Sequence, residues 1–203
     1  MSAIAGIILA GGRATRMGGG DKALLRLAGR PLVEHVQARL APQVAALALN
    51  ANGDPARFAA TGLPVIADTL PGRPGPLAGV LAGMLWARTA LPGATALATA
   101  PVDCPFLPGD LVARLAAAAA PGTIALARSA GRRHPVAALW PLALADDLAA
   151  FLAAGHARVG AFAGTRHPAV AVDFADGGID PFFNVNTPAD LATAGRHCAA
   201  AAR

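Results

Sequence analysis

Short apolar runs alternate with longer amphipathic segments along most of the chain. Continuous apolar runs are typical of strands buried on both faces, and apolar residues repeating every three to four positions are typical of helices with one buried face. Strands are predicted over residues 4–10, 44–49, 63–67, 95–100, 123–127, 136–140 and 169–174, and helices over 31–40, 77–89, 108–120, 142–154, 159–163 and 188–201. This alternation predicts an α/β fold with a mostly parallel sheet covered by helices on both faces.

The length of 203 residues predicts a single domain over 1–203, and the 55% hydrophobic content is ample for its core. No apolar run is long enough for a membrane span, and the first residues lack the basic start of a signal peptide. We therefore expect a cytoplasmic protein that does not bind membranes. Cys104 and Cys198 lie far apart without CxxC partners, which favours two free thiols over a zinc site or a disulfide.

The net charge of +5 fits an anionic ligand, although nucleic acid would fit it as well. The arginines are scattered along the chain, aromatic residues make up only 4%, and tyrosine is absent. A surface that stacks bases needs aromatic side chains among its basic ones. We therefore expect no nucleic-acid partner.

Polar residues and glycines follow the first four predicted strands. Gly11, Asn50, Asp68 and Asp103 stand at these four strand ends, and Asn52 follows Asn50 closely. In open α/β sheets, ligands bind outside the carboxyl ends of the strands. A single aspartate after a strand is usually a turn or helix cap, but four such positions together indicate a ligand site.

A glycine-rich segment from Gly11 to Lys22 follows the first strand. It is not a P-loop, because Ala23 stands where a P-loop has the Ser or Thr that meets Mg²⁺. Glycines let backbone N–H groups converge on phosphate oxygens, and Arg16 and Lys22 can neutralise a pyrophosphate. The segment is predicted to hold a polyphosphate, and its form argues against an ATPase or GTPase.

Two further sets of polar residues leave more than one interpretation open. Asn184 and Asn186 alternate along an extended segment and so share one face, but Asn186 could equally serve the helix that Thr187 is predicted to cap. A polar turn is predicted at 129–135. The arginines around it fit a solvated hairpin tip better than a contact with a substrate phosphate; they are Arg128, Arg132 and Arg133. The five histidines show no ligand spacing and receive no role.

The segment Leu9-Ala-Gly-Gly, followed by Arg16-Met-Gly-Gly and Asp21-Lys22, resembles the signature of nucleotidyltransferases with a Rossmann-like fold. Its extension through residues 24–36 resembles the molybdenum cofactor guanylyltransferases. The resemblance continues at 50–52, 65–68, 75–79, 101–105 and 182–191, and so spans nearly the whole chain. It implies a three-layer α/β/α Rossmann-like nucleotidyltransferase fold.

The resemblance also implies a role for individual residues. Those matching nucleotide-binding positions are Leu9, Ala10, Gly11, Gly12, Lys22, Asn50, Asp68 and Asp103. Asp103 matches the magnesium ligand, and Arg16 lies in the phosphate loop. Asn184 and Asn186 match positions linked to the molybdopterin side. Separately, a carboxylate suits the adjacent N–H donors of guanine, so we expect Asp68 to help read the base or the ribose.

The implied reaction transfers GMP from GTP to the terminal phosphate of Mo-molybdopterin and releases pyrophosphate. Asp103 would hold Mg²⁺ against the α-phosphate, while Lys22 and Arg16 stabilise the leaving group. The part over about 1–105 would bind GTP and the part over about 106–203 molybdopterin. We expect a functional monomer whose protein partners are molybdopterin-insertion proteins and molybdoenzyme-specific chaperones.

Three alternatives remain open from the sequence. A cytidylyltransferase acting on the same pterin typically reads Leu-Ala-Ala-Gly where this chain has Leu9-Ala-Gly-Gly, so the motif here favours guanine. A sugar-1-phosphate nucleotidyltransferase would usually be longer and lack the Asn-Val-Asn-Thr-Pro segment. A non-catalytic GTP-binding protein of cofactor delivery would use the same loop but would not need Asp103 and Mg²⁺.

Overall fold

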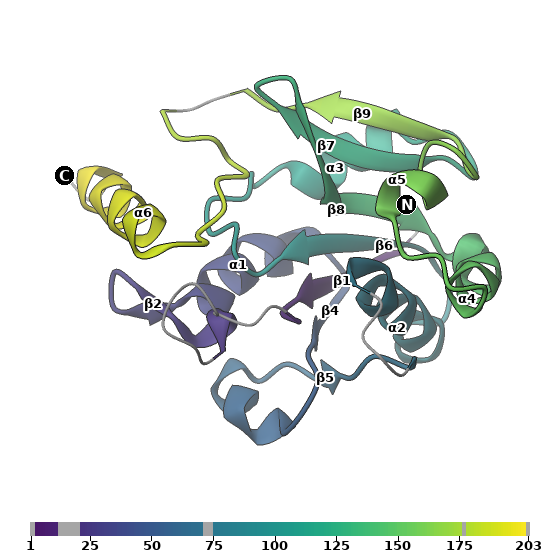
Figure 1. Ribbon diagram of the computed structural model, residues 1–203, viewed down its shortest axis with the longest axis horizontal. Helices are drawn as coiled ribbons and strands as arrows, with labels where there is room; N and C mark the ends of the chain where they lie inside the picture. The colour runs from purple at the N-terminus through teal and green to yellow at the C-terminus, as the bar shows by residue number, and fades with distance from the viewer. Residues whose placement is uncertain (1–2, 12–20, 71–74, 176–177, 202–203) are drawn as a thin grey trace.

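The computed structural model describes residues 3–11, 21–70, 75–175 and 178–201 (Figure 1). The strands are β1 (Ala3–Leu9), β2 (Arg26–Leu27), β3 (Arg30–Pro31), β4 (Ala46–Asn50), β5 (Val65–Ile66), β6 (Ala94–Pro101), β7 (Ile124–Ser129), β8 (Arg132–Pro141) and β9 (Ala169–Asp173). The helices are α1 (Leu32–Leu40), α2 (Pro76–Ala90), α3 (Leu111–Ala118), α4 (Ala145–Ala153), α5 (Val159–Phe162) and α6 (Pro188–Ala201). Short 3₁₀ helices are η2 (Lys22–Leu24), η3 (Ala41–Gln43), η4 (Pro55–Thr61) and η5 (Leu142–Leu144). None of the helices in these ranges has the length and hydropathy to cross a membrane.

Seven strands form one sheet in the order β5-β4-β1-β6-β8-β7-β9. Strands β5, β4, β1 and β6 are parallel neighbours, and β7 is parallel to β9, whereas β8 runs antiparallel to both β6 and β7. The predicted mostly parallel sheet is therefore confirmed. Leu9 at the end of β1 lies level with Asn50 and Pro101, so the polar residues that follow these strands share one edge.

Helices cover both faces of the sheet, which confirms the three-layer architecture (Figure 1). Neighbouring side chains of β1 point to opposite faces, as the pleat of a strand requires. Ile8 packs in a core cluster with Val36 of α1 and residues of α3. Ile7 packs in a second cluster with Met84 of α2 and residues of α4 and α5. Both isoleucines are fully buried, which explains the continuous apolar run in the sequence.

The last helix does not lie on the sheet. Helix α6 packs beside the small β2–β3 hairpin, where Leu27, Leu32, Val185 and Ala194 form a separate buried cluster (Figure 1). This packing returns the end of the chain to its amino-terminal part. The extended segment ahead of α6, residues 178–187, thereby meets the residue that follows β6, since Val185 N donates to the Asp103 carbonyl over 2.9 Å.

The β7–β8 connection differs from the prediction. The predicted turn over 129–135 is wrong, because only Ala130 and Gly131 form it, with φ of 45° and 74°. Two successive left-handed residues are the geometry of a tight hairpin turn. Strand β8 therefore begins at Arg132. Because β8 is antiparallel to β6, its amino end lies at the edge where the parallel strands end. The predicted helix over 108–120 is also shorter, since α3 begins at Leu111.

Candidate active site

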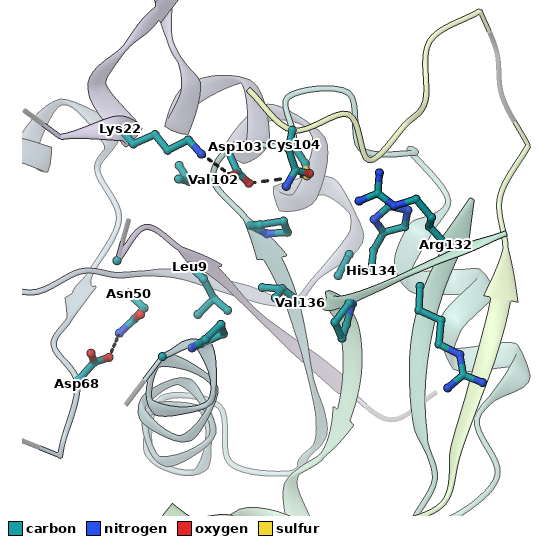
Figure 2. A pocket seen from close by; sticks show the side chains of 18 of the residues that line it. Leu9, Lys22, Asn50, Asp68, Val102, Asp103, Cys104, Arg132, His134 and Val136 are labelled. Atoms are coloured by element: carbon teal, nitrogen blue, oxygen red, sulfur yellow. Dashed lines mark hydrogen bonds and ion pairs between the residues drawn. The ribbon is translucent and has the colours of Figure 1, made fainter. Parts of the chain in front are cut away.

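A cavity of about 470 Å³ opens at the carboxyl edge of the sheet (Figure 2). Seven of the residues predicted for the site line it: Leu9, Gly11, Lys22, Asn50, Asp68, Asp103 and Asn184. Ala10 is buried behind it and donates its N–H to the Asn50 carbonyl over 2.9 Å. Asn186 is held against Lys22. Gly12 and Arg16 lie outside the described residues.

A carboxylate clamped by two amides stands at one end of the cavity. Asp68 accepts hydrogen bonds from Asn50 Nδ2 over 2.9 Å and from Asn52 Nδ2 over 2.7 Å, one on each oxygen. Its backbone N–H donates to Asn52 Oδ1 over 2.9 Å. Each carboxylate oxygen can accept two hydrogen bonds, so both keep one acceptor position for a ligand. The arrangement is therefore a preoriented pair of acceptors.

Helix α2 approaches this pair closely. A Cβ placed at Gly79 would lie 2.3 Å from Asn50 Oδ1 and 2.8 Å from Leu9 Cδ2, so any larger residue would displace both side chains. Asn50 is nearly buried, with 4% of its surface exposed, and it also donates to the Ile66 carbonyl. The glycine that ends the Gly75–Gly79 motif is thus required by packing against Asn50.

The side chains of Lys22 and Asp103 meet at the middle of the cavity. Lys22 Nζ lies 2.6 Å from Asp103 Oδ2 (Figure 2). It also donates to Asn186 Oδ1. Only 10% of the lysine side chain and 17% of the aspartate side chain are exposed. At this depth a charge requires a partner, because both groups have lost most of their water. An anion that enters would compete with Asp103 for Lys22, and a cation would compete with Lys22 for Asp103.

The position of Lys22 is fixed from behind by a second ion pair. Asp21 accepts from Ala23 N over 3.0 Å and so caps η2, while its other oxygen accepts from Arg57 Nε over 2.7 Å. Arg57 also donates to the Asn52 carbonyl over 2.6 Å. These bonds join the end of the glycine-rich segment to the loop that orients Asp68.

The Asn184–Asn186 segment crosses above Asp103. Asn184 lines the cavity and Asn186 contacts Lys22, so both amides reach the site on the same side, as their alternation predicts. Thr187 caps α6, since its Oγ1 accepts from Asp190 N over 3.2 Å, and Asp190 accepts in return from Asn186 N and Thr187 N. The two interpretations of Asn186 are compatible, because its backbone serves the helix and its side chain the site.

Cys104 is a buried thiol directly behind this segment. Its Sγ lies 3.1 Å from Asn184 Oδ1 and 3.5 Å from the Phe182 carbonyl, and 1% of the residue is exposed. Burial, and after it the charge of Asp103, raises the pKa of Cys104 well above 9.0. The sulfur therefore keeps its proton and donates to Asn184 Oδ1, which leaves the Asn184 Nδ2 donors for the cavity.

We expect the two cysteines to differ sharply in reactivity. A raised pKa leaves Cys104 almost without thiolate at pH 8, so iodoacetamide should modify it at least tenfold more slowly than the half-buried Cys198. Mass spectrometry of the labelled peptides measures both rates. In guanidinium chloride the difference should vanish, because unfolding removes the burial. Equal rates in the folded protein would contradict the assigned environment of Cys104.

Three basic residues of the cavity lining were not predicted from the sequence as part of the site. Arg132, Arg133 and His134 stand at the start of β8 and line the cavity, whereas Arg128 pairs with Asp173 through Oδ2 at 2.5 Å. Arg132 and Arg133 are exposed beside the hairpin turn, as the prediction of a solvated hairpin tip has it, and they also line the cavity. The expectation that ligands bind at the carboxyl ends of strands does not predict these residues, because β8 is antiparallel and its amino end lies at the cavity. The order of strands in the sheet is the signal that was missing.

Comparison with known proteins identifies a family and several relatives that this chain resembles over most of its length. A family model described as the MobA-like NTP transferase domain matches residues 6–170. A molybdenum cofactor guanylyltransferase of Mesorhizobium japonicum is 54% identical over 95% of this chain and 95% of its own length. Another from Cereibacter sphaeroides is 58% identical over 93% of this chain and 94% of its own.

Among solved structures, molybdopterin-guanine dinucleotide biosynthesis protein A from Archaeoglobus fulgidus superposes with a TM-score of 0.73. The match covers 97% of this chain and 99% of that protein, at 21% sequence identity. At that identity the likeness concerns the fold. The two curated relatives carry the family assignment by sequence.

Proposed function

This chain belongs to the MobA-like NTP transferase family and is a nucleotidyltransferase, and we propose that it transfers GMP from GTP to the terminal phosphate of molybdopterin. Pyrophosphate leaves, and the product is the guanine dinucleotide form of the cofactor. The observation that carries this proposal is one cavity lined by Asp68, by the Lys22–Asp103 pair and by Asn184. Such a cavity fits two substrates that meet at the central pair.

Asp68 is the proposed contact to guanine. Guanine presents N1–H and the N2 amino group as adjacent donors, and the two free acceptor positions of the clamped carboxylate match them. Adenine has no such pair of donors. A site built for hydrogen bonds rejects a ligand that leaves them unmade, so Asp68 would select the base.

We expect Asp68→Asn to lower the preference for GTP over ATP by tenfold or more. The new amide nitrogen has to face either the ligand or one of the donors from Asn50 and Asn52, and it can accept from neither. Competition binding with both triphosphates measures the preference. Asp54→Asn is a matched control on the neighbouring η4, where the aspartate only caps the helix. An unchanged preference in Asp68→Asn would remove its proposed role.

Nucleotidyltransferases of this family use a divalent metal, and we propose that it is Mg²⁺ held by Asp103. The nearby donors are oxygens, namely the Asp103 carboxylate and the amide oxygen of Asn186. Within the described residues no three His, Cys, Asp or Glu side chains gather as a metal site. One carboxylate with substrate phosphates and water is a set that Mg²⁺ accepts. When bound, the ion would neutralise charge on the reacting phosphates.

The protein's own contribution is positioning and charge neutralisation. The attacking phosphate is already an anion, so the reaction does not depend on a strong general base. Lys22 would exchange its carboxylate partner for the leaving pyrophosphate, aided by Arg16 of the glycine-rich segment. Asn184 would donate to the second substrate through the nitrogen that Cys104 leaves free. Residues about 1–105 would then bind GTP and 106–203 molybdopterin, in a cytoplasmic monomer that exchanges cofactor with insertion proteins and chaperones.

The test is to incubate the protein with molybdopterin, Mg²⁺ and each of the four triphosphates in turn, and to measure pyrophosphate. We expect pyrophosphate to be released with GTP and not with the other three triphosphates. Release with CTP would indicate a cytidylyltransferase, and release with a sugar 1-phosphate in place of molybdopterin would indicate that class. Binding of GTP without any release, at every metal concentration, would indicate a non-catalytic carrier.

A further inference from the structure

Three polar side chains outside the residues used so far are joined at the β8 end of the cavity. His134 Nε2 lies 2.7 Å from Ser129 Oγ, and Ser129 Oγ lies 2.7 Å from Asp180 Oδ1. Ser129 ends β7, His134 stands in β8, and Asp180 belongs to the segment before α6. We name this set the Asp180–Ser129–His134 chain.

The direction of each hydrogen bond in this chain follows from its acid. A carboxylate only accepts, so the Ser129 hydroxyl donates to Asp180, which also accepts from Phe182 N over 2.9 Å. The Ser129 oxygen must then accept from His134 Nε2–H. The remaining ring nitrogen, Nδ1, has no partner among the described residues, and no buried side-chain nitrogen there is left unpaired. Nδ1 is therefore accessible, in a residue that lines the cavity.

The ring is also held by packing. His134 stacks on Phe182 with centroids 4.6 Å apart and planes 20° apart, and both Ser129 and Phe182 are buried. The Phe182 carbonyl lies 3.5 Å from Sγ of Cys104, the residue next to Asp103. The imidazole is thus fixed relative to the centre of the site through one aromatic ring. A histidine that only filled space would not need its tautomer fixed by a buried hydroxyl and a carboxylate.

An arginine completes this end of the cavity. Arg132 precedes His134 by two positions in β8 and lies beside it, across the cavity from Asn50 and Asp68 (Figure 2). Within the described part of the chain no carboxylate forms an ion pair with Arg132, in contrast to Arg128. An arginine without an acidic partner beside an accessible imidazole nitrogen is suited to an anion with several oxygens, because a guanidinium binds phosphate through two parallel N–H bonds.

We propose that Arg132 and His134 bind the terminal phosphate monoester of the second substrate, and that Asp180 and Ser129 position His134 for it. This inference rests on the proposed function, in which that phosphate attacks GTP. Arg132 supplies the charge. His134 Nδ1 shares one proton with a phosphate oxygen, as a donor if the proton is on the ring and as an acceptor if it is on the phosphate. The attacking group is thereby fixed within the cavity that Asp103 also lines.

The shared proton gives the proposal a dependence on pH. Burial lowers the pKa of His134 below 6.5, the charge of Asp180 opposes this shift, and Arg132 adds to it. The second pKa of a phosphate monoester is about 6. Above about pH 7 both partners are unprotonated, so forming the complex takes up a proton and binding weakens up to tenfold per pH unit. The thiol of Cys104, behind Phe182, has a raised pKa and stays neutral.

The experiment measures KM for molybdopterin and for GTP in the full-length protein, by pyrophosphate release. We expect His134→Gln and Arg132→Gln to raise KM for molybdopterin by tenfold or more, and Ser129→Ala by several-fold, with KM for GTP within twofold of the wild-type value. The advantage of wild type over His134→Gln should shrink towards one as the pH rises from 6 to 8.5. A structural role would give a ratio that does not change with pH.

Two control variants separate positioning from general damage. Thr99→Val removes another buried hydroxyl, which donates to the Val136 carbonyl over 2.7 Å and does not contact His134. Arg128→Gln removes a hairpin arginine that already has an acidic partner. Neither should change KM for molybdopterin. Unchanged KM in His134→Gln and Ser129→Ala, with wild type active, would overturn the inference while leaving the proposed function intact.

A binding measurement keeps the inference testable if the wild type releases no pyrophosphate, the outcome in which the proposed function itself fails. Inorganic phosphate is titrated into the protein while the His134 ring proton is followed by NMR, with His134→Gln used to assign it. We expect a shift with phosphate and a rise in the pKa of His134, both reduced in Ser129→Ala and in Arg132→Gln. The absence of any shift, or an equal shift in the wild type, Ser129→Ala and Arg132→Gln, would refute the phosphate site.

Discussion

Replacing Asp103 with alanine is expected to slow pyrophosphate release by at least about 10³-fold while the protein stays folded. Asp103 is the carboxylate at the centre of the cavity, 2.6 Å from Lys22, and it is the proposed Mg²⁺ ligand. Without it the metal loses its protein ligand and Lys22 keeps only the neutral Asn186 as a partner. Turnover should therefore fail even at saturating GTP.

The size of this effect must be separated from a loss of stability. Removing one member of a largely buried ion pair leaves the other charge uncompensated, so Asp103→Ala is expected to melt a few degrees below wild type. Asp103→Asn keeps the shape and an acceptor for Lys22, and it should melt closer to wild type while remaining inactive. Asp110→Asn, at an exposed aspartate paired with Arg114, is the matched control and should be fully active. Wild-type turnover in Asp103→Asn would refute the metal assignment.

Replacing Lys22 with methionine is expected to lower kcat by about 10²–10³-fold with a smaller change in KM. Methionine fills a similar volume without charge, so the leaving pyrophosphate loses its cation while the packing around η2 is kept. Lys22→Arg should recover part of the rate, because the charge returns with a different geometry. A loss confined to KM would mean that Lys22 only binds the ground state.

Lys22 also allows a test that does not depend on turnover. It is the only lysine in the chain, so an amine-directed reagent can modify only Lys22 and the terminal amine. GTP is expected to protect Lys22 from modification, because a phosphate would form an ion pair with its ammonium group. The terminal amine is the internal control and should react equally with and without nucleotide. Equal labelling of Lys22 in both conditions would contradict its proposed contact.

Much of the site could be predicted from the chain because its first half is built from consecutive parallel units. In such units each strand brings its carboxyl end to the same edge, so Asn50, Asp68 and Asp103 meet by the logic of the fold. The structure confirms that these residues line one cavity and adds what orients them. Asn52 donates a hydrogen bond to Asp68, and the lack of a side chain at Gly79 leaves room for Asn50. Both are contacts between separate elements.

The second half could not be predicted in the same way, because its strands change direction. The sequence predicts a hairpin tip at Arg132 and indicates no role for His134, although both line the cavity. The partners of His134 are five residues away at Ser129 and, through Ser129, in a segment that begins some fifty residues later. No spacing rule joins such positions.

The sequence by itself determined the order of most strands and helices, and it carries the prediction that the segment from Gly11 to Lys22 holds a polyphosphate. These follow from local periodicity and from residue chemistry. Only the tertiary structure decided that Lys22 meets Asp103 and Asn186, which are 81 and 164 positions away, and that the amino end of β8 faces the same cavity. The physical reason is that these contacts depend on an antiparallel strand and on α6 packing against the β2–β3 hairpin, and such long-range burial leaves no local pattern in the chain.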